Sequence, residues 1–202
     1  MEGLFLPDYF DIHRILEKLS TVGATSAKIL NEGYRKLLLE EAESYTYKPE
    51  DKVVGTGDKI VRQQMSSFED FTGDSKYILL KHSFQSLLDE YLTLIEPYPF
   101  ETRLTFNSAV LQRYEKGSIG ITPHRDGLSY INLVCLFIVE GRGRFFVCSD
   151  RSGRDSNEID ASPGNVILMR APGFLYSKDR PFHYVNDIQE RRYVFGLRQK
   201  RF

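Results

Sequence analysis

The stretch ITPHRDGLSY, residues 121–130, places two strong ligands for a divalent metal, His124 and Asp126, one residue apart. Side chains alternate between the two faces of an extended strand, so these two would project to one side and Arg125 to the other. A ring nitrogen and a carboxylate oxygen would then point at a common position. Such pairs also occur by chance in turns before a glycine such as Gly127, so a metal site requires a third ligand.

The search for a third ligand is short, because the chain contains only four histidines. His13 and His82 fall within helical patterns and are interpreted as surface residues. His183 lies in RPFHYV, in the β-rich half of the chain. With His124 and Asp126 it completes the set of two histidines and one carboxylate that leaves coordination positions open on Fe(II). The alternative is that His183 is a packed or capping histidine.

The last β-rich run, RRYVFGLRQ, adds two arginines with the spacing of one strand face. Arg192 and Arg198 are separated by an even number of residues, so both project to the same side. Burying two guanidinium groups is costly unless anions meet them, and a dicarboxylate would do so. We expect Arg192 to lie on a strand next to that of His183, deeper in the same barrel. The alternative is that both arginines face solvent while the intervening hydrophobic residues fill the core.

These residues need a scaffold, and the character of the chain changes near residue 100. Before it, helical spacing predicts three helices, the second with Thr25 or Ser26 as its N-cap and the third ended by Pro97. After it, about seven short β-rich runs alternate with turn signals. We predict an α+β fold with a jelly roll and N-terminal helices packed on one sheet. Residues 1–202 would form one domain, with 1–100 as mainly helical support and 101–202 as the β core that carries the site.

Composition narrows the classes of partner. The formal net charge of the 202 residues is -1, so no overall positive field indicates nucleic acid or an anionic membrane. No apolar stretch approaches the roughly 18 residues of a membrane span, and the N-terminus lacks the pattern of a secretory signal. Cys135 and Cys148 flank the turn at 141–143 and are expected as core thiols near one another across a hairpin. Whether they pair is left open, and a reducing, cytoplasmic location is expected.

The combined pattern resembles the Fe(II)/2-oxoglutarate-dependent oxygenases. The order of His-x-Asp, a distal histidine and a downstream arginine is met by His124, Asp126, His183 and Arg192, within about residues 100–200. The resemblance implies a double-stranded β-helix, in which the two histidines and the aspartate hold Fe(II). It also implies an oxidative reaction that consumes 2-oxoglutarate and O2, releases succinate and CO2, and hydroxylates a C–H bond.

Further motifs extend the resemblance to this family. YEKGSIGITPHRD is similar to the family's Tyr-x-x-Gly lead-in, and SPGNVILMRAP to its Pro-Gly turn before the strand that precedes the distal histidine. LQRYEKG and RYVFGLRQ are most similar to AlkB-type nucleic-acid demethylases.

The resemblance implies that Arg192 pairs bidentately with the distal carboxylate of 2-oxoglutarate and that Tyr114 donates its hydroxyl to the same group. Gln112 and Arg198 would lie near the keto-acid end. Gln112 replaces the asparagine usual in the AlkB subgroup, and the interval from His183 to Arg192 is shorter than in that subgroup. The shorter interval resembles that of the wider hydroxylase family, and both departures argue against an AlkB-type substrate.

The substrate is the least determined feature. Candidate lining residues are Arg62, Gln64, Leu128, Tyr130, Phe174 and Tyr176. The last two lie in APGFLYSKDRP, which is predicted as a mobile lid or, alternatively, as a solvated loop whose aromatic residues cover the core. A small molecule or a peptide is the favoured substrate. The alternatives are an AlkB-type demethylase of nucleic acid, which would need a basic groove and aromatic groups for a flipped base, and a non-catalytic metal-binding β-helix sensor. No oligomeric state is predicted.

Overall fold

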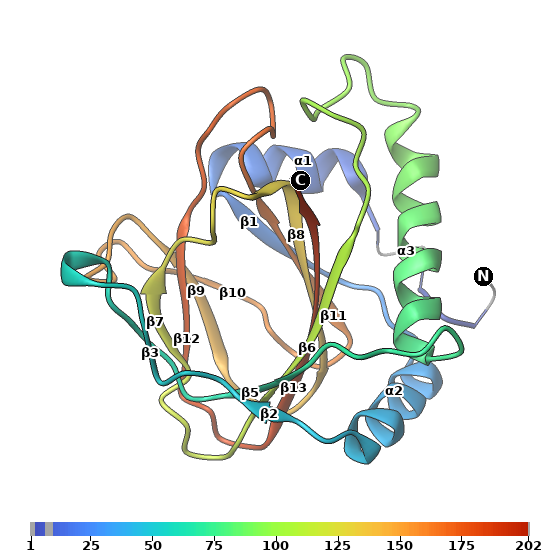
Figure 1. Ribbon diagram of the computed structural model, residues 1–202. Coiled ribbons are helices and arrows are strands. Elements are labelled where there is room, and N and C mark those ends of the chain that lie inside the picture. Colours follow the sequence, from blue (N-terminus) through green and yellow to red (C-terminus); the bar gives the residue numbers. More distant parts are fainter. Residues whose placement is uncertain (1–2, 7–9, 202) are drawn as a thin grey trace.

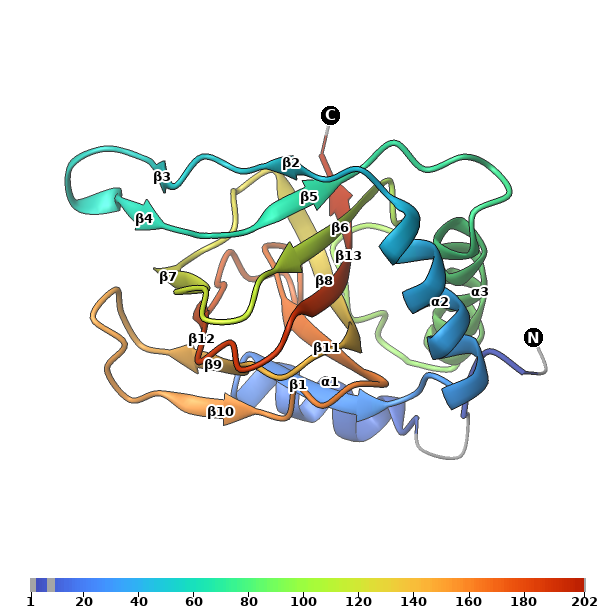
Figure 2. The same ribbon diagram turned by 90° about the horizontal axis from the view of Figure 1, so that it is seen from below.

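Two antiparallel sheets face one another, with helices on the outer side of the larger sheet (Figures 1 and 2). The computed structural model describes residues 3–6 and 10–201. The larger sheet has the strand order β1 (Ala24–Lys28), β11 (Asn165–Arg170), β8 (Tyr130–Glu140), β13 (Arg192–Lys200), β6 (Ser108–Tyr114), β5 (Ser66–Phe68) and β2 (Lys48–Pro49). The smaller sheet has the order β10 (Asn157–Ile159), β9 (Arg144–Cys148), β12 (Phe182–Asn186) and β7 (Ile121–His124). The predicted α+β jelly roll is therefore confirmed.

The remaining elements lie around this pair of sheets. The helices are α1 (Ile12–Thr21), α2 (Glu32–Ser44) and α3 (Lys76–Leu92). A hairpin of β3 (Val53–Val54) and β4 (Val61–Arg62), with the 3-10 turn η2 (Gly57–Lys59) between them, extends beyond β7 (Figure 2). In the described part of the chain, no helix is both long and apolar enough to cross a membrane.

The larger sheet is buried on both faces, and strand alternation divides its side chains between two cores. In β8, Cys135 and Phe137 join the core beneath the helices, whereas Leu136 and Ile138 join the core between the two sheets. Phe84 of α3 packs edge-on against Phe137, with 4.8 Å between ring centroids. A strand covered on both sides has a nearly continuous apolar sequence, which explains the run INLVCLFIVE.

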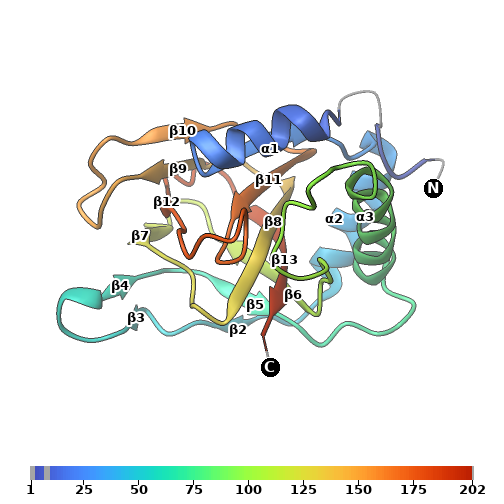
Figure 3. The ribbon, with the colours of Figure 1, turned by 90° about the horizontal axis from the view of Figure 1, so that it is seen from above.

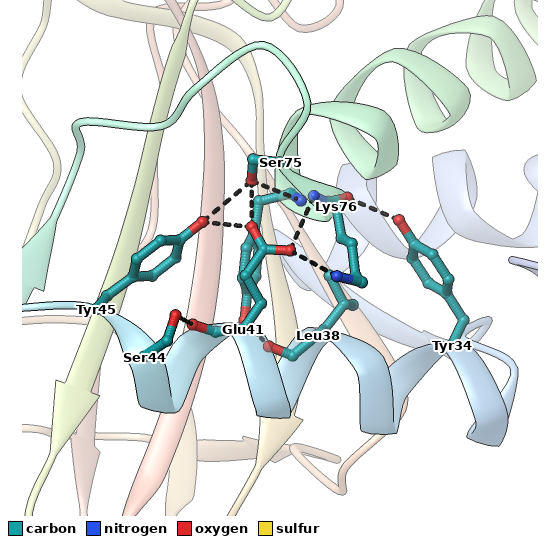
Figure 4. Close-up of polar contacts among 8 residues, drawn as sticks. Tyr34, Leu38, Glu41, Ser44, Tyr45, Ser75 and Lys76 are labelled. Carbon is teal, nitrogen blue, oxygen red and sulfur yellow. Dashed lines mark hydrogen bonds and ion pairs between the residues drawn. The ribbon is translucent and has the colours of Figure 1, made fainter.

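A polar network ties α2 to the start of α3 (Figure 4). The carboxylate of Glu41 accepts hydrogen bonds from the hydroxyls of Tyr45 and Ser75 and from the backbone N–H of Lys76. Burial alone would raise the pKa of Glu41, but these hydrogen bonds outweigh it and lower the pKa. The hydroxyl of Tyr34 donates to the carbonyl of Lys76 at 2.7 Å. The two helices thereby present one surface to the larger sheet.

The N-terminal half contains more sheet than the sequence predicted. Thr25 and Ser26 do not cap a helix, because they lie in β1, which pairs with β11. The N-cap of α2 is Asn31, whose side chain accepts from the backbone N–H of Gly33. Strands β1, β2 and β5 complete the larger sheet, so residues 1–100 contribute to the β core as well as covering it.

The expectation that the two cysteines face one another across a hairpin is wrong. Cys135 lies in β8 of the larger sheet and Cys148 at the end of β9 of the smaller sheet, and β8 and β9 do not pair. Both are free thiols. The turn at 141–143 carries the chain from one sheet to the other, because Gly141 adopts φ +84° and a Cβ there would lie 2.1 Å from the carbonyl oxygen of Arg191.

Candidate metal centre

Three side chains with metal-ligand chemistry converge between the two sheets. His124 ends β7 and lies directly opposite His183 of β12 in the antiparallel register, while Asp126 follows two residues after His124. The Nε2 atoms of both histidines lie 3.8 Å from the same oxygen, Oδ1 of Asp126. In the described part of the chain, these residues form the one group of three His, Cys, Asp or Glu side chains that could share a metal ion, with ligand atoms within 4.8 Å of one another.

Burial and hydrogen bonding prepare these groups to act as ligands. Burial lowers the pKa of His124, and burial together with the charge of His124 lowers the pKa of His183 to about 3. Burial alone would raise the pKa of Asp126, but the charges of Arg198 and the two histidines lower it to about 2. Near neutral pH the group therefore consists of two neutral imidazoles and one carboxylate, the protonation states that a metal requires.

One histidine is also oriented by the backbone. Nδ1 of His124 lies 2.9 Å from the carbonyl oxygen of Thr122, which can only accept, so the ring donates through Nδ1. The lone pair of Nε2 then faces Asp126. A hydrogen bond of this kind on the far ring nitrogen is usual for histidines that bind metals, because it fixes both the tautomer and the ring orientation.

A buried arginine faces the same cavity. Arg192 is 1% exposed, stands opposite Tyr114 in the pairing of β13 with β6, and has its guanidinium carbon 5.8 Å from the centroid of that ring. Among the described residues it forms no ion pair, and its Nε lacks a hydrogen-bond acceptor. Burial lowers the pKa of Arg192 to about 10, so it remains a cation at neutral pH. A buried cation without a partner makes this end of the cavity suited to an anion.

The predicted ligand residues share this cavity with apolar side chains from both sheets. Its lining consists of Gln112, Tyr114, Ile121, His124, Asp126, Leu136, Phe145, His183, Val185, Arg192, Val194 and Arg198. Nε of Arg198 lies 3.4 Å from Oδ2 of Asp126. The expectation that Arg192 and His183 lie on neighbouring strands is wrong: β13 belongs to the larger sheet and β12 to the smaller, so the residues face one another across the cavity.

Four predicted substrate residues lie outside the cavity, on loops or at strand ends. Tyr130 begins β8, and the guanidinium carbon of Arg198 lies 5.3 Å from its ring centroid. Leu128 and Tyr176 are 64% and 69% exposed on loops. Arg62 is exposed on β4, and its backbone N–H donates to the side chain of Thr122 on β7. None of the four lines the cavity itself.

Two other predicted substrate residues have structural contacts instead. Phe174 is 3% exposed and belongs to the core beneath the helices, where its ring packs against Phe100. The alternative prediction, that this residue covers the core, is the one that the structure supports. The side-chain oxygen of Gln64 accepts from the backbone N–H of Ile119 at 3.2 Å. Neither side chain lines the cavity. The assignment of Phe174 as a substrate residue is corrected, because its ring is buried in a different core, whereas that of the exposed Gln64 stays a prediction.

Sequence analysis did not single out some of the cavity wall. Phe145 stacks against the ring of His183 with 5.7 Å between centroids. Val185 lies on the strand of His183 and Ile121 on the strand of His124, and both line the cavity. Strand alternation could have predicted Val185 as part of the wall, because it shares a strand face with His183. The neighbouring strand β9, which pairs with β12 in the smaller sheet and carries Phe145, could not be identified from spacing alone.

Comparisons with known proteins agree with the geometry at the level of fold. No protein-family model and no curated protein sequence matches the chain. A prolyl hydroxylase from Trichoplax adhaerens, in complex with a hypoxia inducible factor oxygen degradation domain peptide fragment, is 13% identical, with a TM-score of 0.68 over 93% of this chain and 88% of that one. A 2OG-Fe(II) oxygenase family oxidoreductase from Burkholderia pseudomallei is 15% identical, with a TM-score of 0.59 over 96% and 92% of the two chains.

The structure of OsALKBH1 is similar as well, at 13% identity and a TM-score of 0.58 over 88% of this chain and 98% of that one. The resemblance to the Fe(II)/2-oxoglutarate oxygenases is therefore confirmed for the fold, which extends over nearly the whole chain. At these identities the likeness defines the scaffold, and the chemistry must be argued from the side chains.

Proposed function

We propose that this protein is an Fe(II)- and 2-oxoglutarate-dependent dioxygenase that hydroxylates a small molecule or a peptide and releases succinate and CO2. One observation carries the proposal: two histidines and a carboxylate share a cavity with a buried arginine that forms no ion pair with any residue the structure describes. The triad fits a metal with open positions, and the arginine fits the carboxylate of a cosubstrate. Both halves of the site are thus present on one scaffold.

The donor set fits Fe(II). His124, Asp126 and His183 would hold the ion on one side, which leaves positions for 2-oxoglutarate and O2. When bound, the iron with these cosubstrates supplies the oxidising chemistry, and the protein supplies position and protection. The histidines are neutral and the aspartate is ionised near neutral pH, so iron would not have to displace protons from its ligands.

The opposite end of the cavity fits the cosubstrate. Arg192 can donate two parallel hydrogen bonds to the distal carboxylate of 2-oxoglutarate. Burial raises the pKa of Tyr114 to about 12, so its hydroxyl keeps its proton and can donate to the same carboxylate. Arg198 and Gln112 lie on the same wall, which suits the keto-acid end. The apolar side chains of Leu136, Phe145 and Val194 would exclude water around the reacting groups.

Anaerobic reconstitution with Fe(II) and 2-oxoglutarate, followed by a succinate assay in air, tests the proposal. The protein would be incubated with a library of metabolites and peptides, and succinate formation should require both iron and an intact triad. Tight binding of Fe(II) and 2-oxoglutarate without turnover across that library would favour a non-catalytic sensor. The two free thiols support a reducing, cytoplasmic location for this activity.

An AlkB-type demethylase of nucleic acid is the second candidate. The likeness of fold to OsALKBH1 favours it, whereas the net charge of -1 does not. A demethylase must also hold a flipped base against aromatic side chains. Succinate formation with methylated oligonucleotides, and none with metabolites or peptides, would select this candidate.

A further inference from the structure

Three loops at one end of the smaller sheet each carry an arginine. The loops join β7 to β8, β9 to β10 and β11 to β12, and they contain Arg125, Arg151 and Arg180 respectively. The pairings of His183 with His124 and of Phe182 with Cys148 place the three loops at the same end of the sheet. The first and third of these loops face the viewer in Figure 3. Residues distant in sequence are therefore brought to one rim.

The three arginines gather around Phe182, the neighbour of the ligand His183. The guanidinium carbon of Arg125 lies 4.1 Å from the centroid of the Phe182 ring, and that of Arg151 lies 5.6 Å from it. A guanidinium that contacts a ring through its face keeps its N–H donors free at its edge. Arg180 lies two residues before Phe182, and burial together with the charge of Arg125 lowers its pKa. Arg125 and Arg180 are thus close enough for their charges to repel one another, and Arg125 and Arg151 share one ring.

No acidic side chain of the described residues forms an ion pair with this arginine cluster, by which we mean Arg125, Arg151 and Arg180. None of the three forms an ion pair with a described residue, although thirteen other Lys and Arg residues and two histidines do so elsewhere in the described chain. In addition, Nη1 of Arg151 is buried and has no hydrogen-bond acceptor in the described structure. Uncompensated positive charge of this kind costs stability and is suited to an external anion.

The acids on the same loops are occupied by other partners. Asp150 accepts from Ser152 and lies 3.7 Å from Arg154. Asp179 pairs with Arg170, which anchors the last of the three loops to the end of β11. Asp126 belongs to the candidate metal ligands. The acids of these loops therefore form their ion pairs and hydrogen bonds outside the arginine cluster, although the charge of Asp126 acts weakly on Arg180.

We propose that Arg125, Arg151 and Arg180 bind a phosphate group of the substrate at the rim of the metal site. This proposal rests on the proposed function, because the rim position gains its meaning from the triad beside it. Arg125 lies between the ligands His124 and Asp126 in sequence, but its side chain projects to the other side of the strand. A phosphate held here would therefore anchor a substrate that reaches around the end of β7 into the cavity. Several planar donor forks match the several acceptor oxygens of a phosphate. The cluster is compact, which favours one phosphate of a small molecule over the extended backbone of a nucleic acid.

Calorimetric titration of the full-length protein with phenyl phosphate tests this proposal at constant ionic strength. The variants Arg125→Gln, Arg151→Gln and Arg180→Gln should each weaken binding about tenfold or more, the scale of one charge-assisted hydrogen bond. Arg151→Lys keeps the charge but loses the planar fork, and it serves if the glutamine variant does not fold. Arg154→Gln is the matched control, because Arg154 lies in the same loop as Arg151 but faces Asp150.

A second titration excludes the inner cavity as the binding place. Phenyl phosphate should bind to Arg192→Met as it does to the wild type, because Arg192 is buried in the cavity and does not belong to the rim. Wild-type affinity in the three cluster variants, or equal losses in Arg154→Gln, would overturn the proposal. So would tight binding of an eight-nucleotide DNA that strengthens with length and weakens steeply with salt, which would indicate nucleic acid instead.

Succinate formation, measured separately, keeps the two proposals distinguishable. Loss of phosphate binding in the cluster variants together with an absence of any turnover would contradict the dioxygenase proposal alone. Turnover that depends on the triad, in a protein that does not bind phenyl phosphate, would contradict the phosphate proposal alone.

Discussion

Replacing Arg192 should separate stability from cosubstrate affinity. The side chain is 1% exposed and burial lowers its pKa to about 10. Relative to an ordinary guanidinium, that lowering corresponds to a cost of about 3 kcal/mol at neutral pH. Because the pKa of this basic group is lower in the folded state than in the unfolded state, the cost applies in full below pH 10 and disappears only at higher pH. Arg192→Met removes the buried charge and should raise the free energy of unfolding of the protein without ligands by about 1–3 kcal/mol.

The same substitution should abolish measurable affinity for 2-oxoglutarate. Arg192→Lys keeps the positive charge but loses the planar fork, which is worth about 1.5–3 kcal/mol in a charge-assisted pair. The 2-oxoglutarate requirement should therefore rise roughly tenfold to a hundredfold. Arg191→Lys is the matched control, because Arg191 is exposed and pairs with Glu115 at 2.9 Å. Urea unfolding measures stability, and anaerobic calorimetry with Fe(II) measures affinity.

Two results would refute this reasoning. If Arg192→Met were less stable than the wild type by several kcal/mol, the arginine would have an internal partner that the cavity does not reveal. If Arg191→Lys and Arg192→Lys weakened 2-oxoglutarate binding equally, the inward orientation of Arg192 would not determine affinity. In that case the proposed role of Arg198, which lines the same cavity, would also be lost.

Three further predictions concern the ligands and the scaffold. His124→Ala and Asp126→Ala should each abolish iron-dependent succinate formation while circular dichroism stays that of the wild type; full activity in either variant would remove the triad. Burial lowers the pKa of His183 to about 3, so the free energy of unfolding of the metal-free protein should fall by about 1.4 kcal/mol per pH unit through this group as the pH falls below about 6.5. His183→Gln should therefore flatten the dependence of urea unfolding on pH, and an unchanged slope would contradict this. Glu41→Ala should lower the free energy of unfolding by about 2–4 kcal/mol because it leaves several buried donors unpaired. The control Glu40→Ala, at an exposed position, should change the free energy of unfolding by under about 0.5 kcal/mol. Equal effects of the two substitutions would argue against the network in Figure 4.

Local spacing was enough to predict the parts of the site that lie on one strand or directly after it. The period of two along an extended strand relates His124 to Asp126 and Arg192 to Arg198, and both pairs line one cavity. Helical spacing likewise identified α3, whose buried residues recur at intervals of three and four. The jelly roll followed from the number of short β-rich runs and the turn signals between them.

Local spacing failed where a partner distant in sequence decides the structure. Thr25 and Ser26 suit a helix cap or a strand equally well, and pairing with β11 makes them a strand. Phe174 lies in a loop that sequence reasoning places near the substrate, but its ring fills the core beside Phe100. The hairpin expected between Cys135 and Cys148 does not form, because the chain crosses to the second sheet.

The sequence by itself determined which residues share a strand face, because backbone geometry alone sets that period. Only the tertiary structure decided that β13 and β12 face one another across a cavity, since pairing between distant strands depends on packing of the whole chain. It also decided that Arg192 is enclosed with no ion pair among the described residues. Two loops bring Arg125 and Arg151 to the ring of Phe182, and a third places Arg180 within reach of the charge of Arg125. The burial of a side chain and the balance of charge around it depend on every neighbouring element, so the spacing of residues along one segment cannot predict them.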